Sequence, residues 1–521
     1  NAATQATKTL TLDDTAPSIT LNSTFEGDNK VNASEDGHVV IFGSSSGLEA
    51  GRTVTVTLAD SSSTVSTTAT VLGSGAWVAE SADISALTDG NITVTANASD
   101  TAGNAASAAT KTITLDNAAP TITIATTLEG DNIVNIAEDA TVVISGTTAN
   151  VEDSQTVTVT FTDGTTTISK TASVSSNAFD LTGGQIADIT NLNDGPITVT
   201  ASVSDAHGNA AVAAVRTITL DNLAPQVSID ATLEIDNIVN NAEEGSVVVT
   251  GTSAGAVGRT VTVTADDSDG GTTAVSATGT IQTDGTYSVT LGTLAGLVDG
   301  SITITADVSD LAGNAATQAT KTLTLDDTNA TVSGVSASDI SNGSFKAGAI
   351  IPIEVTFSEV VNVTGTPQLK LETGSTDRLV NYKSGTGTDV LVFEYTVEDG
   401  DTSGDLNYHA TNPLTLNGGT INDVAGNAAT LTLASTGNSG ALDNAKNLVI
   451  DTTVPTISIA ATLEGDNIVN SSEDDTVIIT GTTSGAADGQ TVTVTFTDGT
   501  TTITKTTTVS SDAFTSSSAV A

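Results

Sequence analysis

The sequence predicts an all-β protein, built from small sandwich domains that follow one another along the chain. A short segment ending in acidic residues and proline recurs at intervals of about one hundred residues, a period typical of tandem domains. Between these segments lie short runs of Thr, Val and Ile with strict alternation, which favour strands. Turns rich in Gly, Asp and Asn separate the runs, and no apolar pattern has helical spacing.

The recurring segment marks the joints between domains, and its last residue is Pro17, Pro120, Pro225, Ala330 or Pro455. Because the chain starts and stops inside repeats, we expect a segment of a longer array. Ala330 replaces the proline of the other joints, so this joint is expected to be more flexible. The predicted domains are the last strand of a preceding repeat (1–16), three repeats (17–119, 120–224 and 225–329), a longer divergent module (330–454) and a truncated repeat (455–521).

The repeat at 120–224 shows the strands most clearly. Alternating or β-branched runs predict strands at 121–125, 141–146, 156–162, 165–174, 197–203 and 214–220, and Phe179 opens a further strand. Acidic or Gly-containing turns separate these runs. About seven short strands of this kind predict an immunoglobulin-like β-sandwich.

One aromatic residue stands at a matching place in each ordinary repeat: Trp77, Phe179, Tyr287 and Phe514. A small sandwich needs a large side chain to fill its centre, so these residues are expected in the cores. The alternative is a platform for stacking sugars, which would need several exposed aromatic residues close together. We favour the core.

The composition excludes several classes of function. The net charge is −47, with 61 acidic and 14 basic residues, so neither nucleic acid nor an anionic membrane is an expected partner. No long apolar run predicts insertion into a membrane. The chain has no cysteine, which excludes disulfides, zinc–thiolate sites and a cysteine nucleophile.

Catalytic signatures are missing from the sequence as well. The histidines His38, His207 and His409 have no recurring partners, so neither a catalytic histidine nor a zinc site is predicted. Paired carboxylates could serve a glycosidase, but an enzyme needs one site and not a set repeated in every unit. We therefore expect a protein that is not an enzyme.

Four classes of acidic residue recur at fixed positions in the repeats. The classes are a Glu-x-Asp loop after the first strand, an Asp-Gly turn, an Asp-x-x-Gly-Asn loop and the acids of the joint itself. The candidate metal ligands are Glu26, Asp28, Glu129, Asp131, Glu234, Asp236, Glu464 and Asp466 in the first class, Asp89, Asp194 and Asp299 in the second, Asp100, Asp205, Asp310 and Asp423 in the third, and Asp13, Asp14, Asp116, Asp221, Asp326, Asp327 and Asp451 in the fourth.

Sandwich topology predicts that these classes meet at the joints. The loop after the first strand and the turn before the sixth lie at the end where the last strand leaves, and the Asp-x-x-Gly-Asn loop of the next domain faces them. Carboxylates from two domains and a linker would then supply the six to eight oxygens that Ca²⁺ prefers. The alternative is that Asp and Asn only form turns. Recurrence of all four classes at the joints favours calcium.

The chain resembles the calcium-dependent immunoglobulin-like repeats of giant bacterial surface adhesins of the repeats-in-toxin, type I-secreted class. The resemblance is carried by the Leu-Asp-Asn-x-x-Pro joint, the Leu-Glu-Gly-Asp-Asn loop and the Asp-x-x-Gly-Asn loop, and it covers essentially the whole chain. Ile235 departs from the pattern, because it replaces the glycine of the second motif. The resemblance implies calcium bound at the joints of a stiff stalk, anchored at the outer membrane and projecting a ligand-binding region for adhesion and biofilm formation.

We therefore expect an extracellular structural extender, whose direct partners are the neighbouring repeats of the same chain. The alternative is an adhesive module at 330–454 that binds a glycan or a protein on another cell. This divergent module lacks the Glu-Gly-Asp-Asn loop and holds three of the four tyrosines. The alternative predicts an exposed aromatic or acidic pocket in this module alone.

Overall fold

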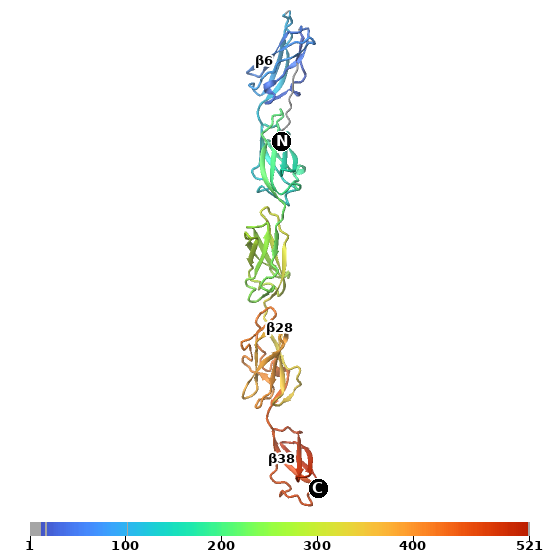
Figure 1. Cartoon of the computed structure of the whole chain (residues 1–521), viewed down its shortest axis with the longest axis vertical. Coiled ribbons are helices and arrows are strands. Elements are labelled where there is room, and N and C mark those ends of the chain that lie inside the picture. The colour runs from blue at the N-terminus through green and yellow to red at the C-terminus, as the bar shows by residue number, and fades with distance from the viewer. Residues whose placement is uncertain (1–11, 16–17, 102, 519–521) are drawn as a thin grey trace.

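The computed structural model describes residues 12–15, 18–101 and 103–518. Strands dominate these ranges, and α1 (Leu442–Ala445) is the only α-helix within them. The strands form two-sheet units that follow one another in a line, from the N-terminal unit at the top of Figure 1 to the C-terminal unit at the bottom. The predicted class, an all-β array of immunoglobulin-like sandwiches, is confirmed. None of the helices described is long and apolar enough to cross a membrane.

The five units are named here by the residues that form them. They are unit 1 (18–116), unit 2 (121–221), unit 3 (226–326), unit 4 (330–451) and unit 5 (456–518). The segments between them are joint A (116–120), joint B (221–225), joint C (326–330) and joint D (451–455).

Unit 2 shows how the alternating pattern builds a sandwich. Along β13 every second side chain points into the core, and Val157, Val159 and Phe161 are fully buried. One sheet holds β10 (Thr121–Ile124), β12 (Ser145–Ala149) and β15 (Ala178–Asp180). The other holds, in spatial order, β11 (Ile133–Asn135), β17 (Ala214–Asp221), β16 (Gly195–Ser202), β13 (Thr156–Thr162) and β14 (Thr167–Ser173), and η2 (Gly183–Gln185) is a short 3-10 turn.

Two details of unit 2 differ from the prediction. The second strand, expected at 141–146, lies at Ser145–Ala149, and Val142 makes only an isolated bridge to Ala187. Within the stretch expected to be an acidic loop, Ile133–Asn135 forms the short strand β11, which pairs in parallel with β17. Such a pairing depends on contacts far apart in the sequence, which a local pattern does not reveal.

Unit 1 repeats this plan. One sheet holds, in spatial order, β3 (Lys30–Asn32), β9 (Ala109–Asp116), β8 (Gly90–Ala98), β5 (Thr53–Ala59) and β6 (Thr64–Thr70). The other is a closed set of β1 (Leu12–Thr15), β2 (Ser18–Leu21), β4 (Phe42–Ser46) and β7 (Ala76–Val78). The 3-10 turn η1 (Asp36–His38) follows β3 in the sequence. The predicted strand of a preceding repeat, 1–16, falls mostly outside the described residues. Its part Leu12–Thr15 pairs with β2 and β7.

Unit 3 has the same two sheets as unit 2. One holds β18 (Gln226–Ile229), β20 (Val248–Ala254) and β23 (Thr286–Thr290), and the other β19 (Ile238–Asn240), β25 (Ala319–Asp326), β24 (Gly300–Val308), β21 (Thr260–Asp266) and β22 (Val275–Thr280).

Unit 4 is larger and is built around the long strand β28 (Ile350–Thr364). Its main sheet also holds β26 (Val332–Ser336), β31 (Thr388–Thr396), β30 (Arg378–Ser384), β29 (Gln368–Glu372), β33 (Asn407–Tyr408), β34 (Leu414–Thr415) and β35 (Thr420–Asn422), and a second sheet holds β27 (Gly343–Phe345), β36 (Leu448–Asp451) and β32 (Thr402–Ser403). Ala330 is fully buried in its core, and the Ala330 carbonyl accepts a hydrogen bond from the N–H of Thr430.

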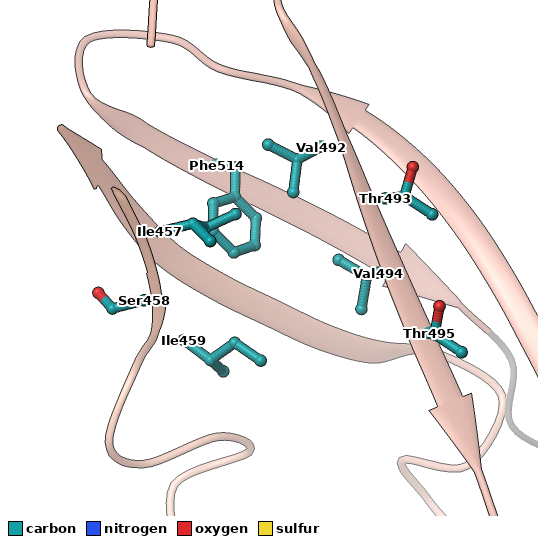
Figure 2. A pocket seen from close by; sticks show the side chains of 8 residues that line it. All are labelled: Ile457, Ser458, Ile459, Val492, Thr493, Val494, Thr495 and Phe514. Carbon is teal, nitrogen blue, oxygen red and sulfur yellow. The ribbon is translucent and has the colours of Figure 1, made fainter. Parts of the chain in front are cut away.

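Unit 5 has β37 (Thr456–Ile459), β38 (Val477–Ser484) and β41 (Ala513–Ser518) in one sheet, and β39 (Thr491–Thr497) with β40 (Thr502–Thr508) in the other. Figure 2 shows an apolar slot between them, lined by Ile457, Ile459 and Phe514 among others. In unit 2, where β16 and β17 contact β10, the matching Ile122 and Ile124 are buried. Ile457 and Ile459 are more than half exposed. The slot is therefore an uncovered core face and not a built ligand site.

The matched aromatic residues lie in the cores, as predicted: Trp77, Phe179, Tyr287 and Phe514 are all buried. Each pairs across its sheet with a glycine, as Phe179 does with Gly146. An added Cβ at Gly146 would collide with the Phe179 ring and with the Thr123 carbonyl. Of the tyrosines in unit 4, Tyr395 and Tyr408 are buried, so they belong to its core and not to an exposed aromatic surface.

Candidate functional site: the joints between units

In units 1, 2 and 3 a parallel strand pair brings an asparagine to the end of the unit. In unit 2 the register pairs Asn135 with Asp221, the first residue of joint B. The corresponding pairs are Asn32 with Asp116 and Asn240 with Asp326. Each of these three units therefore presents a strand end with a side-chain amide beside the acid that begins the linker.

The Asp-x-x-Gly-Asn segment folds into a loop at the facing end of the next unit. In unit 2 the N–H of Asn209 donates to Asp205 Oδ1 at 2.9 Å, which closes the loop. Asp310 and Asp423 close their loops in the same way, at 2.9 and 2.8 Å. The loop glycine has φ near +90° (Gly208, +90°), a conformation that side chains with a Cβ rarely adopt. We name this segment the docking loop.

The asparagine of the docking loop connects the two units. At joint A, Asn209 Nδ2 donates to the Asp116 carbonyl at 2.8 Å, and Asn209 Oδ1 accepts from the N–H of Ala33 at 2.8 Å. Asn32 Nδ2 returns a hydrogen bond to the His207 carbonyl at 3.2 Å.

The same three hydrogen bonds recur at the next two joints. Asn314 bridges the Asp221 carbonyl and the N–H of Ile136 at joint B, and Asn427 bridges the Asp326 carbonyl and the N–H of Asn241 at joint C. The returning bonds run from Asn135 to Ala312 and from Asn240 to Ala425. Three of the predicted joints are thus docked interfaces with one common geometry.

The Asp-Gly turn acids hold the linkers. Asp89, Asp194 and Asp299 each accept a hydrogen bond from the second linker residue, at 2.9, 3.0 and 3.1 Å. At joint B, Asp194 and Asp310 therefore both lie beside the linker that begins with Asp221, and a cation shared by these acids stays a prediction.

The Glu-x-Asp loop acids make their described contacts within their own units. Glu129 Oε1 accepts from the N–H of Val143, and Asp131 Oδ1 accepts from the N–H of Ile133. The glutamates Glu26, Glu129, Glu234 and Glu464 all have positive φ, between 41° and 49°. A role for this class in a site shared across the joint stays a prediction.

The strongest carboxylate cluster lies at joint C. Asp326, Glu359 and Asp423 each offer an oxygen within 4.8 Å of the others. Asp423 is only 2% exposed, and its Oδ2 has no hydrogen-bond partner among the described residues. Burial raises the pKa of Asp326, and the charge of Asp423 raises it further. Burial, Asp326 and Asp423 likewise raise the pKa of Glu359, so these carboxylates repel one another.

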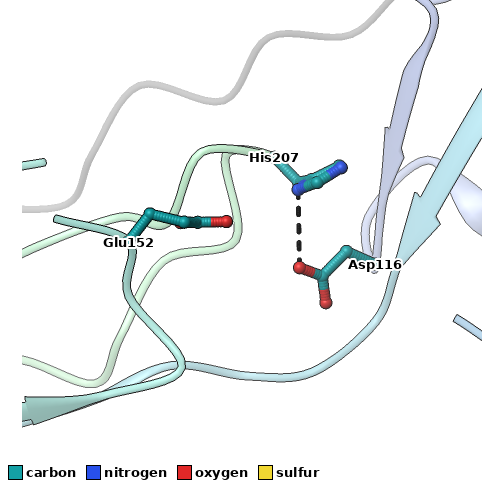
Figure 3. A group of neighbouring side chains, drawn as sticks. All are labelled: Asp116, Glu152 and His207. Carbon is teal, nitrogen blue, oxygen red and sulfur yellow. Dashed lines mark ion pairs between the residues drawn. The ribbon is translucent and has the colours of Figure 1, made fainter. Parts of the chain in front are cut away.

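A related cluster lies at joint A, where Asp116, Glu152 and His207 meet. Figure 3 shows the three side chains converging from three different segments. Sequence reasoning did not find Glu152 or Glu359. Glu152 lies in the loop before β13, and Glu359 lies within β28 of the divergent unit, so no repeated motif marks either residue.

A second group of acids gathers at joints A and C. Burial raises the pKa of Asp36, and the charges of Asp83 and Asp89 raise it further. At joint C, burial raises the pKa of Asp327, and the negative charges of Asp299 and Glu244 raise it further.

Asn117 at joint A and Asn222 at joint B occupy the linker position that Asp327 occupies at joint C. The side-chain oxygens of both asparagines are buried and have no hydrogen-bond partner among the described residues. These residues were missed as well. Asp36 and Glu244 were also missed, although the recurring Asn-x-x-Glu-Asp/Glu segment, as in Asn32–Asp36, is a signal that could have found them.

The contacts of the remaining predicted ligands are as follows. Asp13 and Asp14 are in β1, but their side chains are outside the described part of the structure. Asp100 accepts from the N–H of Asn104 at 2.7 Å in the docking loop of unit 1. At joint D, a hydrogen bond from Thr453 to Asp451 lowers the pKa of Asp451. Asp28, Asp236 and Asp466 accept from backbone N–H groups two residues on.

Several solved structures are similar to this chain. A tetra-tandem repeat from the extending region of a large adhesion protein aligns with 26% identity and a TM-score of 0.31, covering 81% of this chain and 97% of that one. A Ca²⁺-stabilised adhesin of an Antarctic bacterium aligns with 24% identity and a TM-score of 0.37, covering 86% and 100%. A 1.5-MDa bacterial ice-binding adhesin aligns with 23% identity and a TM-score of 0.29, covering 62% and 100%. No protein-family model and no curated protein matches the chain.

Proposed function

We propose that this chain is part of the extender region of a bacterial cell-surface adhesin, and that Ca²⁺ bound at its joints makes it a stiff stalk. The repetition of one docking geometry at joints A, B and C supports this most directly. A set of hydrogen bonds that recurs at every such joint favours a role in setting the angle between units, and a single catalytic centre would not need it.

Electrostatics explains why the docked joints need a cation. Two unit charges 4.8 Å apart repel by about 3–4 kcal/mol at an effective dielectric constant of 20. Docking at joint C holds three carboxylates at this distance or less, and it buries Asp423. Without a cation, this repulsion opposes the hydrogen bonds of Asn427.

The residues present fit calcium. Asp326, Glu359 and Asp423 would hold the ion at joint C, and the buried, unpartnered Oδ2 of Asp423 is the clearest sign of a missing positive charge. The ligands are hard oxygens in flexible loops, which suits Ca²⁺ better than Mg²⁺. The second group, with Asp299 and Asp327, would hold a further ion.

The proposed setting follows from these properties. Calcium modules outside cells bind at about 10⁻⁴–10⁻³ M, so the joints would be loaded outside the cell and empty in the cytosol. A stalk anchored at the outer membrane would then project a distal ligand-binding region, and its direct contacts would be the neighbouring repeats. Adhesion and biofilm formation would be the outcome at the level of the cell.

Small-angle X-ray scattering of the whole chain tests this proposal. In millimolar Ca²⁺ we expect a maximum dimension close to that of the line of units in Figure 1. In chelator we expect a smaller mean dimension and a broader distance distribution, because the joints bend. Mg²⁺ at equal concentration is the control, and it should restore the long form only in part. Identical profiles in calcium and chelator would contradict the proposal.

A further inference from the structure

Joint A differs from the other docked joints in its chemistry. His207 occupies the docking-loop position that Ala312 and Ala425 occupy at joints B and C, as the matching hydrogen bonds to their carbonyls show. Joint A therefore adds an imidazole where the other two joints have only a methyl group.

The His207 ring faces two carboxylates. Its Nδ1 lies 3.4 Å from Asp116 Oδ2, and Glu152 offers an oxygen within 4.8 Å of both residues (Figure 3). A distance of 3.4 Å is too long for a good hydrogen bond. Both ring nitrogens are buried, and neither has a hydrogen-bond partner in the described part of the chain. An imidazole with two buried nitrogens and no hydrogen bond is costly unless a further ligand is bound.

The backbone holds all three side chains in place. Asp116 Oδ1 accepts from the N–H of Ala118 at 3.0 Å, which leaves Oδ2 toward His207. Glu152 Oε2 accepts from the N–H of Ala206 at 2.8 Å. The N–H of His207 donates to Asp205 Oδ1 at 2.9 Å. These backbone hydrogen bonds hold the three side chains of the cluster in position within the docked joint.

The donor set favours a transition metal over calcium. Ligand atoms at about 2.0–2.1 Å from a tetrahedral Zn²⁺ are about 3.3 Å apart, close to the separation of Nδ1 and Oδ2. A neutral imidazole with one or two carboxylates is a usual zinc set, whereas calcium takes oxygen ligands.

Lys30 strengthens this difference. Its Nζ donates to the Ala206 carbonyl at 2.5 Å, whereas Ile133 and Ile238 occupy the matching strand position at joints B and C. The lysine occupies a carbonyl oxygen, which leaves fewer oxygens for an ion that needs many.

The other histidine cluster lacks these features. His409 lies near Glu372 and Asp377 in unit 4. There Lys370 pairs with Asp377 at 2.7 Å and neutralises it, and His409 Nδ1 accepts from the N–H of Thr411 at 3.1 Å. A carboxylate and a ring nitrogen are therefore already engaged.

We propose that joint A binds a zinc-class divalent cation through Asp116, Glu152 and His207, so that one joint of the array selects a different ion from the rest. The inference rests on the proposed function only in taking joint A to be a docked joint of the stalk. The remaining coordination positions would be filled by water or by other oxygens of the joint.

Histidine-selective NMR of the whole chain tests the site, because the chain has only three histidines. Zinc is added to the protein in millimolar Ca²⁺. We expect the signal that is absent from His207→Ala to shift within one equivalent of zinc, while those of His38 and His409 stay in place. Competition with a chromophoric zinc chelator should show an affinity loss of at least ~10-fold in His207→Ala and in Glu152→Gln. His409→Ala is the matched control and should bind like the wild type.

The proposal is overturned if the His207 signal does not move at stoichiometric zinc, or if His207→Ala keeps the wild-type affinity. His207→Ala introduces the residue found at joints B and C, so it should fold and should keep its calcium-dependent scattering profile. Loss of zinc binding with an intact calcium response would support the zinc site alone. A wild-type scattering profile that does not change with calcium would contradict the extender function, but it would not affect the conclusion on zinc binding.

Discussion

At the scale of single residues, the Glu-x-Asp loop of unit 3 carries backbone strain. Ile235 has φ +72° and is 93% exposed, so no packing compensates for this conformation. The matching residues of the other repeats are Gly27, Gly130 and Gly465, with φ between 81° and 86°. A β-branched residue in the left-handed region costs about 1–2 kcal/mol, which glycine avoids.

Ile235→Gly should therefore stabilise unit 3 by about 1 kcal/mol, after allowing for the greater flexibility of glycine in the unfolded chain. Hydrogen exchange of β24 peptides within the whole chain measures the stability of this unit. Gly130→Ile in unit 2 is the reverse control and should destabilise that unit by a similar amount. Faster exchange of β24 in Ile235→Gly would contradict the strain argument.

Another residue-scale feature is the buried ion pair of unit 4. Asp401 is 1% exposed and accepts hydrogen bonds from Arg378 and from the Tyr395 hydroxyl. Burial alone would raise the pKa of Asp401, but the hydrogen bonds from Arg378, the Glu398 N–H and Tyr395 outweigh burial and lower it.

Because the pKa of Asp401 is lowered by folding, its contribution to stability is present above the unfolded pKa of about 3.9 and is lost as pH falls through the folded value. Denaturant unfolding followed by tyrosine emission reports mainly on unit 4, which holds three of the four tyrosines. Asp401→Asn should destabilise unit 4 at pH 7 by roughly 3 kcal/mol and flatten its loss of stability below pH 4. Asp377→Asn, which breaks a partly exposed pair, should have a much smaller effect. An equal acid response in Asp401→Asn and wild type would refute this.

The candidate site was only partly predictable at this scale. Asp194, Asp221 and Asp310 could be placed at one joint because sandwich topology fixes which loops share an end. The bridging role of Asn314 could not, because it depends on a side chain reaching a carbonyl 93 residues away. Glu152 was missed because it stands in a loop without a repeated motif, and Glu359 because no repeated motif marks its place in β28.

At the scale of elements, the docking loop and the parallel strand before the joint act as one unit. Asn314 joins the carbonyl of Asp221 to the N–H of Ile136, which lies directly after β11. The alternating segment 156–162 was predicted in full as a strand, since its pattern is local. The three-residue strand β11 was not, since its pairing with β17 is long-range.

Asn314→Ala should loosen joint B without unfolding either unit, because it leaves both cores unchanged. A hydrogen bond contributes about 1 kcal/mol, so protection of the Ile136 amide against hydrogen exchange should fall about fivefold. Asn427→Ala is the matched control: it should leave Ile136 protected and expose the amide of Asn241 at joint C. If Ile136 kept its full protection in Asn314→Ala, the docking contact would not hold the joint.

At the scale of the whole molecule, the joints set the angles between consecutive units. Each unit has its own hydrophobic core, and at joints A, B and C the docking-loop asparagine links one core to the next. A net charge of −47 opposes any compact arrangement of the chain, and we therefore expect cations to regulate the joints. We therefore propose that Ca²⁺ narrows the range of angles between consecutive units.

Pulsed electron spin resonance across joint C tests whether Ca²⁺ narrows these angles. The chain has no cysteine, so Ser301→Cys in unit 3 and Thr430→Cys in unit 4 place two spin labels without background, both at exposed positions. We predict one narrow distance distribution in millimolar Ca²⁺ and a broad one in chelator, with the broad form persisting in calcium when Asp423→Asn is added. A distance distribution of the same width with and without calcium would contradict the proposal that Ca²⁺ stiffens the joints.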